Sequence, residues 1–334
     1  MIRKLRPVAR ILQLTPVFCG LTLGQSPPPT IMTIDLDNFV EYRQGLLYDP
    51  SKFATDPNIT IVIPANNFVV VTLLGDIVAV NGEPAKGTYV GRTRSVLATP
   101  TPIPGQAIAD VTRTALREYV FEILKSDGTP IGTFIGSGFS GGAPPPGAPL
   151  AQLGGNWAIT GGTGAFLGAR GQTGEGVGAA RAALMSEDPA YRRTHGGGKK
   201  RYILQVIPIF SPLIVTTANG LAVTHSNDFT LVSASKPAAG GEILSLFATG
   251  LGPTRPGVDP GQPFPSNPQA VVNSPVDVTV NGKPAEVLGA AGFPAAVDGY
   301  QLNFRVPPGT AKGLASIQVS AAWIAGAPVS IMVQ

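Results

Sequence analysis

The chain has 334 residues, which is long enough for two domains of ordinary size, each with its own core. Glycine (42) and proline (33) are abundant and only 13% of residues are charged, about half the usual share, so many turns between short strands are favoured over long surface helices. The net charge of +4 equals the contribution of Arg3, Lys4, Arg6 and Arg10; the balanced remainder gives no basic face for a nucleic-acid partner.

Residues 1–24 have the order of a secretory signal peptide. A basic start precedes the apolar run ILQLTPVFCGLTLG, so cleavage is expected after Gly24 and the mature protein is expected outside the cytoplasm, extracellular or periplasmic. A basic leader on a cytosolic protein is the alternative. The run is too short for a membrane span, and none is expected later in the chain. Cys19, the only cysteine, lies in this leader, so no disulfide, thiol nucleophile or Cys-based zinc site is expected.

Residues 25–40 are predicted to be a Pro-rich linker and residues 41–210 a strand-rich domain. Its strands are expected in ITIVIPANNFVVVTLLGDIVAV, TYVGRTRSVLAT, DVTRTALREYVFEIL, GTPIGTFIGSGF and KRYILQVIPIF. Asn81-Gly82 marks a hairpin turn. One short helix is predicted at Ala179–Met185.

Residues 211–227 are predicted to be a linker and residues 228–334 a second set of strands. In GYQLNFRVP, Tyr300, Leu302 and Phe304 alternate with Gln301 and Asn303. Clean alternation indicates one buried and one solvated face, as in a small antiparallel sandwich.

The stretch AITGGTGAFLGARGQ, residues 158–172, decides between two architectures. A dinucleotide-binding domain would need a helix directly behind the glycines. The residues that follow are themselves rich in glycine, and each glycine costs about 1 kcal/mol in a helix interior. We therefore predict a β-hairpin, with Gly161, Gly162 and Gly164 forming its turn and a bulge.

These residues also carry a family resemblance. AITGGTGAFLGARGQ, together with the upstream GDIVAVNGEPAKGTYVGRTRS, resembles the plant dirigent proteins and allene oxide cyclases. The resemblance implies an all-β fold with an antiparallel, eight-stranded, calycin-like barrel that holds a small hydrophobic molecule. The C-terminal stretch beginning GEILSLFATGLGPTRPG is similar to the Ig-like (IPT/TIG-like) C-terminal domain of secreted acidobacterial proteins, which implies an Ig-like β-sandwich on an exported bacterial protein.

The resemblance supplies two catalytic candidates. Arg170 matches an arginine of the family hairpin, but the family's acid after the glycine turn is replaced by Ala165. Glu83-Pro84 corresponds to the family's acidic-Pro pair. A carboxylate inside an apolar barrel would have a raised pKa and act as a general acid. The alternative is that Glu83 is a solvated turn residue.

Alternation in DVTRTALREYVFEIL places one, more apolar, face toward the barrel interior. That face has the members Val111, Arg113, Ala115, Arg117, Tyr119, Phe121 and Ile123. Arg113, Arg117, Tyr119 and Phe121 are the predicted ligand-binding residues, because an arginine presents a planar fork of donors to a carboxylate. Alternatively, the arginines sit at the strand ends and extend outward to solvent.

No cofactor or metal site is expected, because the two histidines, His195 and His225, lie in separate predicted loops and no nucleotide or hydrolase motif occurs. Three functions follow. The barrel binds a small hydrophobic molecule while the Ig-like domain contacts an extracellular protein or polysaccharide. Alternatively, the barrel is a cyclase or isomerase, or a structural or adhesive surface protein filled by its own side chains.

Overall fold

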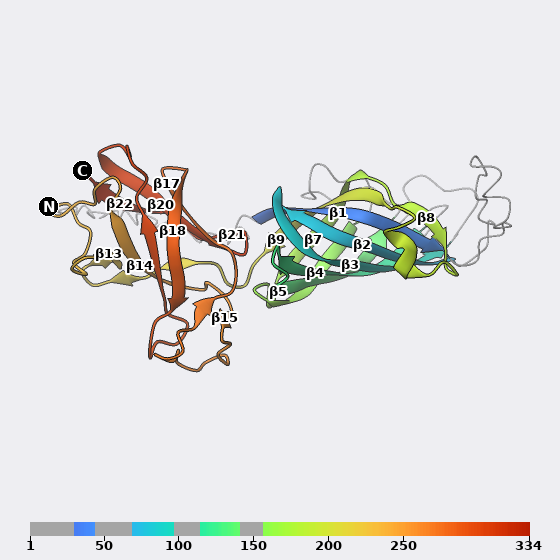
Figure 1. The fold of residues 1–334 in the computed structure, drawn as a ribbon, viewed down its shortest axis with the longest axis horizontal. Coiled ribbons are helices and arrows are strands. Elements are labelled where there is room, and N and C mark those ends of the chain that lie inside the picture. Colours follow the sequence, from blue (N-terminus) through green and yellow to red (C-terminus); the bar gives the residue numbers. More distant parts are fainter. Residues whose placement is uncertain (1–29, 44–68, 97–113, 141–155) are drawn as a thin grey trace, which may run out of the picture.

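The computed structural model describes residues 30–43, 69–96, 114–140 and 156–334, and these form two β units (Figure 1). Helix is limited, among these residues, to a single short 3-10 turn, η2 (Pro189–Arg192). No helix of the described ranges is long and apolar enough to cross a membrane.

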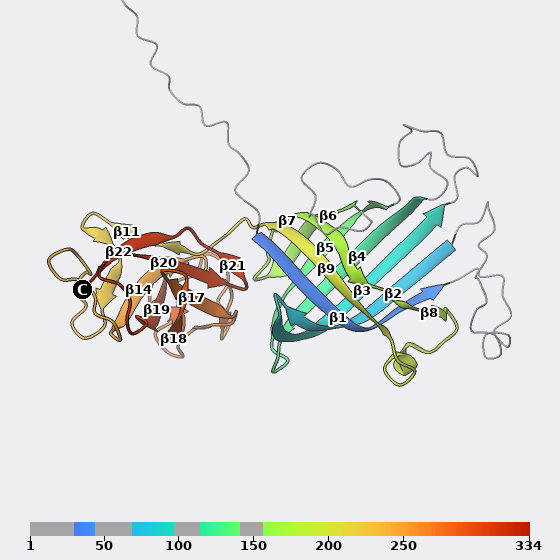
Figure 2. The same ribbon diagram turned by 90° about the horizontal axis from the view of Figure 1, so that it is seen from above.

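The first unit is a closed antiparallel barrel of eight strands, as predicted (Figure 2). The strands are β1 (Thr30–Arg43), β2 (Val69–Val80), β3 (Glu83–Val96), β4 (Thr114–Lys125), β5 (Pro130–Ser140), β6 (Asn156–Gly164), β7 (Arg170–Gly178) and β9 (Gly198–Ile207). Each pairs with the next, and β1 closes the ring by pairing with both β2 and β9. A ninth strand, β8 (Arg181–Leu184), runs parallel to β1 outside the ring.

Two sequence predictions in this unit are wrong. The barrel begins at Thr30, within the predicted linker 25–40, because β1 supplies the strand that joins β2 to β9 and closes the ring. The segment predicted as a helix, Ala179–Met185, contains strand β8, because its backbone pairs with residues 40–43 at the C-terminal end of β1.

The glycine-rich stretch forms a hairpin, as predicted, but its turn lies further along the chain. β6 and β7 are antiparallel, and the residues between them, 165–169, form the turn. Gly161 and Gly162 remain in β6, where the register with β5 shifts at Ile135/Gly136. Gly164 has a φ of +61°, and a Cβ there would lie 2.4 Å from the Ile131 carbonyl oxygen, so this position requires glycine.

The second unit is a curled antiparallel sheet whose two halves share one apolar core. Its principal strands are β14 (Ile243–Thr249), β17 (Val276–Val280), β18 (Lys283–Gly292), β19 (Tyr300–Arg305), β20 (Gly313–Ala321) and β22 (Val329–Val333). The short strands are β10 (Leu213–Ile214), β11 (Thr216–Thr217), β12 (Gly220–Leu221), β13 (Val223–His225), β15 (Thr254–Arg255), β16 (Val271–Val272) and β21 (Ile324–Ala325). Residues 211–227, predicted as a linker, contain β10–β13, because β10 and β13 pair with β14 and extend the sheet.

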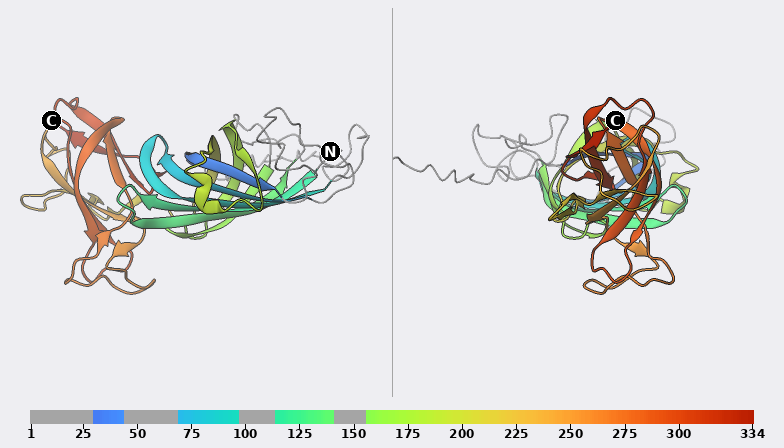
Figure 3. Two further views of the ribbon diagram at one scale, coloured as in Figure 1. Left: turned by 45° about the vertical axis from the view of Figure 1, so that its right-hand side comes forward. Right: turned by 90° about the vertical axis from the view of Figure 1, so that its left-hand side faces the viewer.

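The two units meet end to end at an apolar joint (Figure 3). The turn between β20 and β21 reaches the end of the barrel, where Ala322 and Ile324 belong to the barrel core and are at most 3% exposed. Two hydrogen bonds flank this contact: Trp323 Nε1 donates to Glu83 Oε2 (3.1 Å), and Asn273 Nδ2 donates to the Pro130 carbonyl oxygen (2.6 Å).

A group of ion pairs, which we call the ionic clamp, holds the loop between β8 and β9 against the barrel. The Asp76 carboxylate of β2 accepts hydrogen bonds from Arg192 and Arg193, the latter at 2.8 Å to each oxygen, and from Asn38 Nδ2 at 3.0 Å. Burial acts to raise the pKa of Asp76, but the hydrogen bonds from Arg193 and Asn38 and the charges of both arginines outweigh it and hold that pKa below its ordinary value of 3.8.

This clamp predicts a pH dependence of stability. Because the pKa of Asp76 is lowered in the folded state, its contribution is complete above pH 3.8 and is lost as the pH falls through the folded pKa. We expect Asp76→Asn to cost about 1 kcal/mol at neutral pH and nothing in strong acid, since the site is partly solvated. Denaturant unfolding across this range measures it. The exposed Glu118→Gln is the control, and an Asp76→Asn penalty independent of pH would contradict the assignment.

Candidate ligand-binding cavity

The middle of the barrel is filled by its own aromatic side chains. Tyr89, Phe121 and Tyr202 are fully or almost fully buried, with ring centroids 4.8–5.3 Å apart. The Tyr202 and Tyr89 hydroxyls form a hydrogen bond (3.2 Å). The barrel therefore has a packed layer where an open apolar cavity was expected.

Beyond this layer, away from the joint, lies an interior charge cluster of Arg117, Glu175 and Lys200. Arg117 Nη1 donates to Glu175 Oε1 (2.5 Å), and Lys200 Nζ donates to Glu175 Oε2 (2.9 Å). Arg117 Nε also donates to Thr93 Oγ1 (2.9 Å), and its guanidinium lies 4.4 Å from the ring centroid of Trp157. Burial acts to lower the pKa of Arg117, but the surrounding acidic groups raise it on balance, so the cation persists.

The inward face predicted for β4 is confirmed in its described residues. Arg117, Tyr119 and Phe121 point into the barrel, so the arginine does not extend outward; Val111 and Arg113 lie outside the described residues. Tyr119 Oη donates to Thr173 Oγ1 (2.7 Å), and burial raises its pKa. Since Arg117 and Tyr119 already bond within the barrel, a ligand carboxylate would have to displace Glu175.

The catalytic candidates lie away from this interior. Glu83 is exposed at the barrel rim, where its carboxylate meets Trp323, so it is not the buried acid considered above. Arg170 is also exposed, and its Nη1 donates to the Ala169 carbonyl oxygen (3.0 Å). Glu175 is an interior carboxylate that the sequence interpretation missed; its only sequence signal is the two-residue spacing from Thr173, obscured by Gly174 and Gly176.

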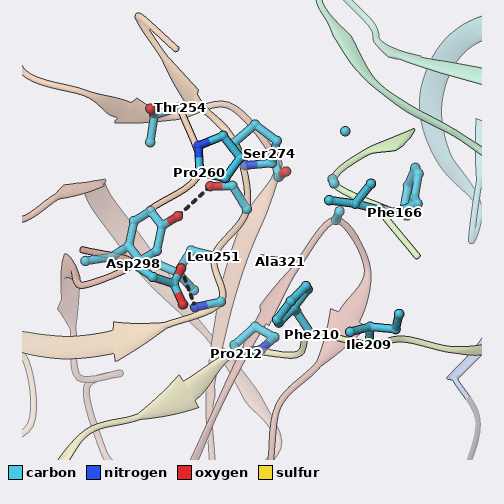
Figure 4. A pocket seen from close by; sticks show the side chains of 18 of the residues that line it. Phe166, Ile209, Phe210, Pro212, Leu251, Thr254, Pro260, Ser274, Asp298 and Ala321 are labelled. Carbon is cyan, nitrogen blue, oxygen red and sulfur yellow. Dashed lines mark hydrogen bonds between the residues drawn. The ribbon is translucent and has the colours of Figure 1, made fainter. Parts of the chain in front are cut away.

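An apolar hollow lies at the joint between the units (Figure 4). Its volume is about 410 Å³. Three segments form its walls: the β6–β7 turn, the chain leaving β9, and loops of the second unit. The principal lining residues are Ala165, Phe166, Leu167, Ile209, Phe210, Pro212, Leu251, Val258, Tyr300, Ala322 and Ile324. This lining is mostly aliphatic and aromatic, which suits an apolar ligand.

The polar side chains that line the cavity differ in whether their hydrogen-bonding groups already have partners. Tyr300 Oη donates to the Gly252 carbonyl oxygen (2.7 Å), and burial raises the pKa of this phenol. Asp298 Oδ1 accepts from the Gly250 amide (3.4 Å). Ser274, in contrast, is only 6% exposed, and its hydroxyl has no hydrogen-bond partner in the described part of the chain. An unpaired buried hydroxyl is costly, so Ser274 is the polar group of this lining with unused hydrogen-bonding capacity.

The histidines do not come together. His195 is exposed and stacks on Tyr191, whereas His225 is buried in β13 with Nδ1 2.5 Å from Glu242 Oε1. His225 therefore lies in a strand and not in a loop, because β13 pairs with β14. Within the described ranges no group of three or more His, Cys, Asp and Glu side chains is arranged for a metal ion.

Comparison of the chain with protein-family models, with curated proteins and with solved structures finds no match. The functional conclusion therefore rests on the geometry of the chain itself.

Proposed function

We propose that this protein binds a small apolar molecule carrying one hydrogen-bonding group, in the cavity at the joint between its units. The observation that carries the proposal is a hollow of about 410 Å³ with an apolar lining and the unpaired Ser274 hydroxyl. Ligand sites are commonly found between domains and combine an apolar wall with few polar groups. The ligand's apolar part would contact the exposed side chains of Leu167, Ile209 and Phe210, and its polar group would bond Ser274.

This proposal keeps the expected ligand class but moves the site out of the barrel. The aromatic layer occupies the interior, so the barrel acts as a rigid wall that positions Phe166. Catalysis of the cyclase or isomerase type is less well supported, because both carboxylate oxygens of Glu175 are already occupied by Arg117 and Lys200.

We also propose a family likeness for each of the two units and a location of the protein outside the cytoplasm. A dirigent-like barrel is supported by the hairpin at residues 158–172 and the closed ring of eight strands. An Ig-like second unit is supported by its antiparallel strands around one core. Export is supported by the basic and apolar leader, residues 1–24.

The test uses the full chain and a neutral naphthylamine dye whose fluorescence rises in apolar surroundings. Ala165→Phe would fill the cavity, and Ala158→Phe, on the exposed outer face of β6, is its matched control. We expect the wild type and Ala158→Phe to bind the dye with the same affinity and Ala165→Phe to lose binding. Native mass spectrometry of protein from its own host would then identify a retained molecule.

Ser274→Ala separates a ligand contact from a packing role. Removing the unpaired hydroxyl is expected to leave the free protein as stable or more stable by up to about 1 kcal/mol. The same change should weaken a retained ligand that has a polar group by about tenfold. Equal dye binding by wild type and Ala165→Phe would refute the proposed site.

A further inference from the structure

A second hollow lies on the outer face of the curled sheet, along β16, β18 and β19. Its volume is about 300 Å³. The lining residues are Gln269, Val271, Leu288, Gly289, Ala290, Ala291, Gly292, Phe293, Pro294, Gln301 and Asn303, and none of them is charged. We call this hollow the amide groove. It shares no lining residue with the cavity at the joint.

A row of hydrogen bonds that runs from the turn after β13 across β14 to β19 orients the amides of this groove. Ser226 Oγ and Ser245 Oγ bond each other (2.9 Å), and Ser245 Oγ donates to Asn303 Oδ1 (2.9 Å). Gln301 Nε2 donates to the same Asn303 oxygen (3.1 Å). With its oxygen used twice, Asn303 has its amide group fixed and its N–H donors directed away from the row, while Gln301 retains an acceptor oxygen.

An aromatic surface borders the same groove. Phe293 is 42% exposed, and its ring meets that of Phe247 edge-on with centroids 5.5 Å apart. Phe247 lies opposite Gln301 in the pairing of β14 with β19, so the aromatic pair lies next to the amide row. The lining includes a run of four small residues, 289–292, and a Cβ built at Gly289 has no atom within 4 Å.

We propose that the amide groove binds a neutral carbohydrate. Oriented amides donate to and accept from hydroxyl groups, and an exposed aromatic ring packs against the C–H face of a sugar ring. The neutral lining offers no counter-charge to an anionic or cationic ligand, whose desolvation would go uncompensated. The ligand class is therefore a short, uncharged saccharide chain.

The test is calorimetric titration of the full chain with three neutral probes: cellohexaose, laminarihexaose and maltohexaose. Polygalacturonate is the charged comparison. Gly289→Phe would place a ring in the groove from a position whose Cβ meets no atom within 4 Å, and Gly257→Phe, at another exposed glycine, is its matched control. Gln301→Ala removes one amide, and the exposed Gln334→Ala is its control.

We expect at least one neutral hexaose to bind the wild type and both controls, and Gly289→Phe to abolish binding. Gln301→Ala should weaken binding by about fivefold to tenfold, the value of one or two hydrogen bonds. Dye binding at the joint should be the same in all four variants, which separates this proposal from the previous one. Absence of binding to all three hexaoses, equal binding by Gly289→Phe, or preference for polygalacturonate would each overturn the proposal.

Discussion

Replacing Phe166 by alanine is expected to lower the free energy of unfolding of the barrel by about 4 kcal/mol. Phe166 is 1% exposed and stacks on Phe134 with ring centroids 4.1 Å apart, closing the barrel end that faces the joint. The backbone around it is tied down, with the Ala165 amide bonded to Ile131 and the Ala169 amide to Phe166. The site therefore has little freedom to collapse around the missing ring.

Denaturant unfolding followed through Trp157 measures this loss. Trp157 is buried in the barrel, and a Trp323→Phe background removes the other tryptophan signal. The matched control is Leu167→Ala in the same turn, where the side chain is 58% exposed and the change should stay within about 0.5 kcal/mol. Similar losses for both substitutions would show that Phe166 does not close the barrel.

The second large effect concerns the interior charge cluster. Glu175→Leu is expected to destabilise the barrel by about 3 kcal/mol, because it leaves Arg117 and Lys200 buried without a counter-charge. The exposed Glu122→Leu, on the outer face of β4, is the control and should have little effect. The same unfolding measurement applies.

A triple replacement tests whether the cluster matters for stability as a unit. Arg117→Met, Glu175→Leu and Lys200→Met together remove all three charges, and we expect most of the single-variant loss to be recovered. A triple variant as unstable as Glu175→Leu alone would instead show that the loss comes from packing and not from uncompensated charge.

Alternation and turn chemistry were sufficient to predict several strands of the first unit, whereas its closure into an eight-stranded barrel was expected only from the family resemblance. The hairpin at residues 158–172 and the inward face of β4 follow from local pattern, and both are confirmed. β1 was missed because its alternation of Met32, Ile34 and Leu36 with polar residues is short and breaks at Asn38, where φ is +48°. Its strand character is imposed by the neighbours, since a ring of eight strands closes only through β1. Likewise β8 was predicted as a helix because its alanines favour one.

The candidate sites depend on contacts that local pattern does not encode. Ser274 and Ala165 lie far apart in the chain and meet only because the two units pack end to end. Glu175 lies between glycines, where no apolar alternation marks the inward face. The sequence pattern places Gln301 and Asn303 on the solvated face of their strand, but the orientation of their amides depends on Ser245 of a different strand.

The apolar joint has a practical consequence for dividing this protein. A barrel expressed alone, ending after β9, would lose Ala322 and Ile324 from its core and leave the hydrophobic ring of Phe166 facing water. The remaining half would present Ala322 and Ile324 to solvent. Newly exposed hydrophobic patches of this kind promote self-association. Recombinant work on either half therefore needs the other half present, or polar replacements on the facing surface.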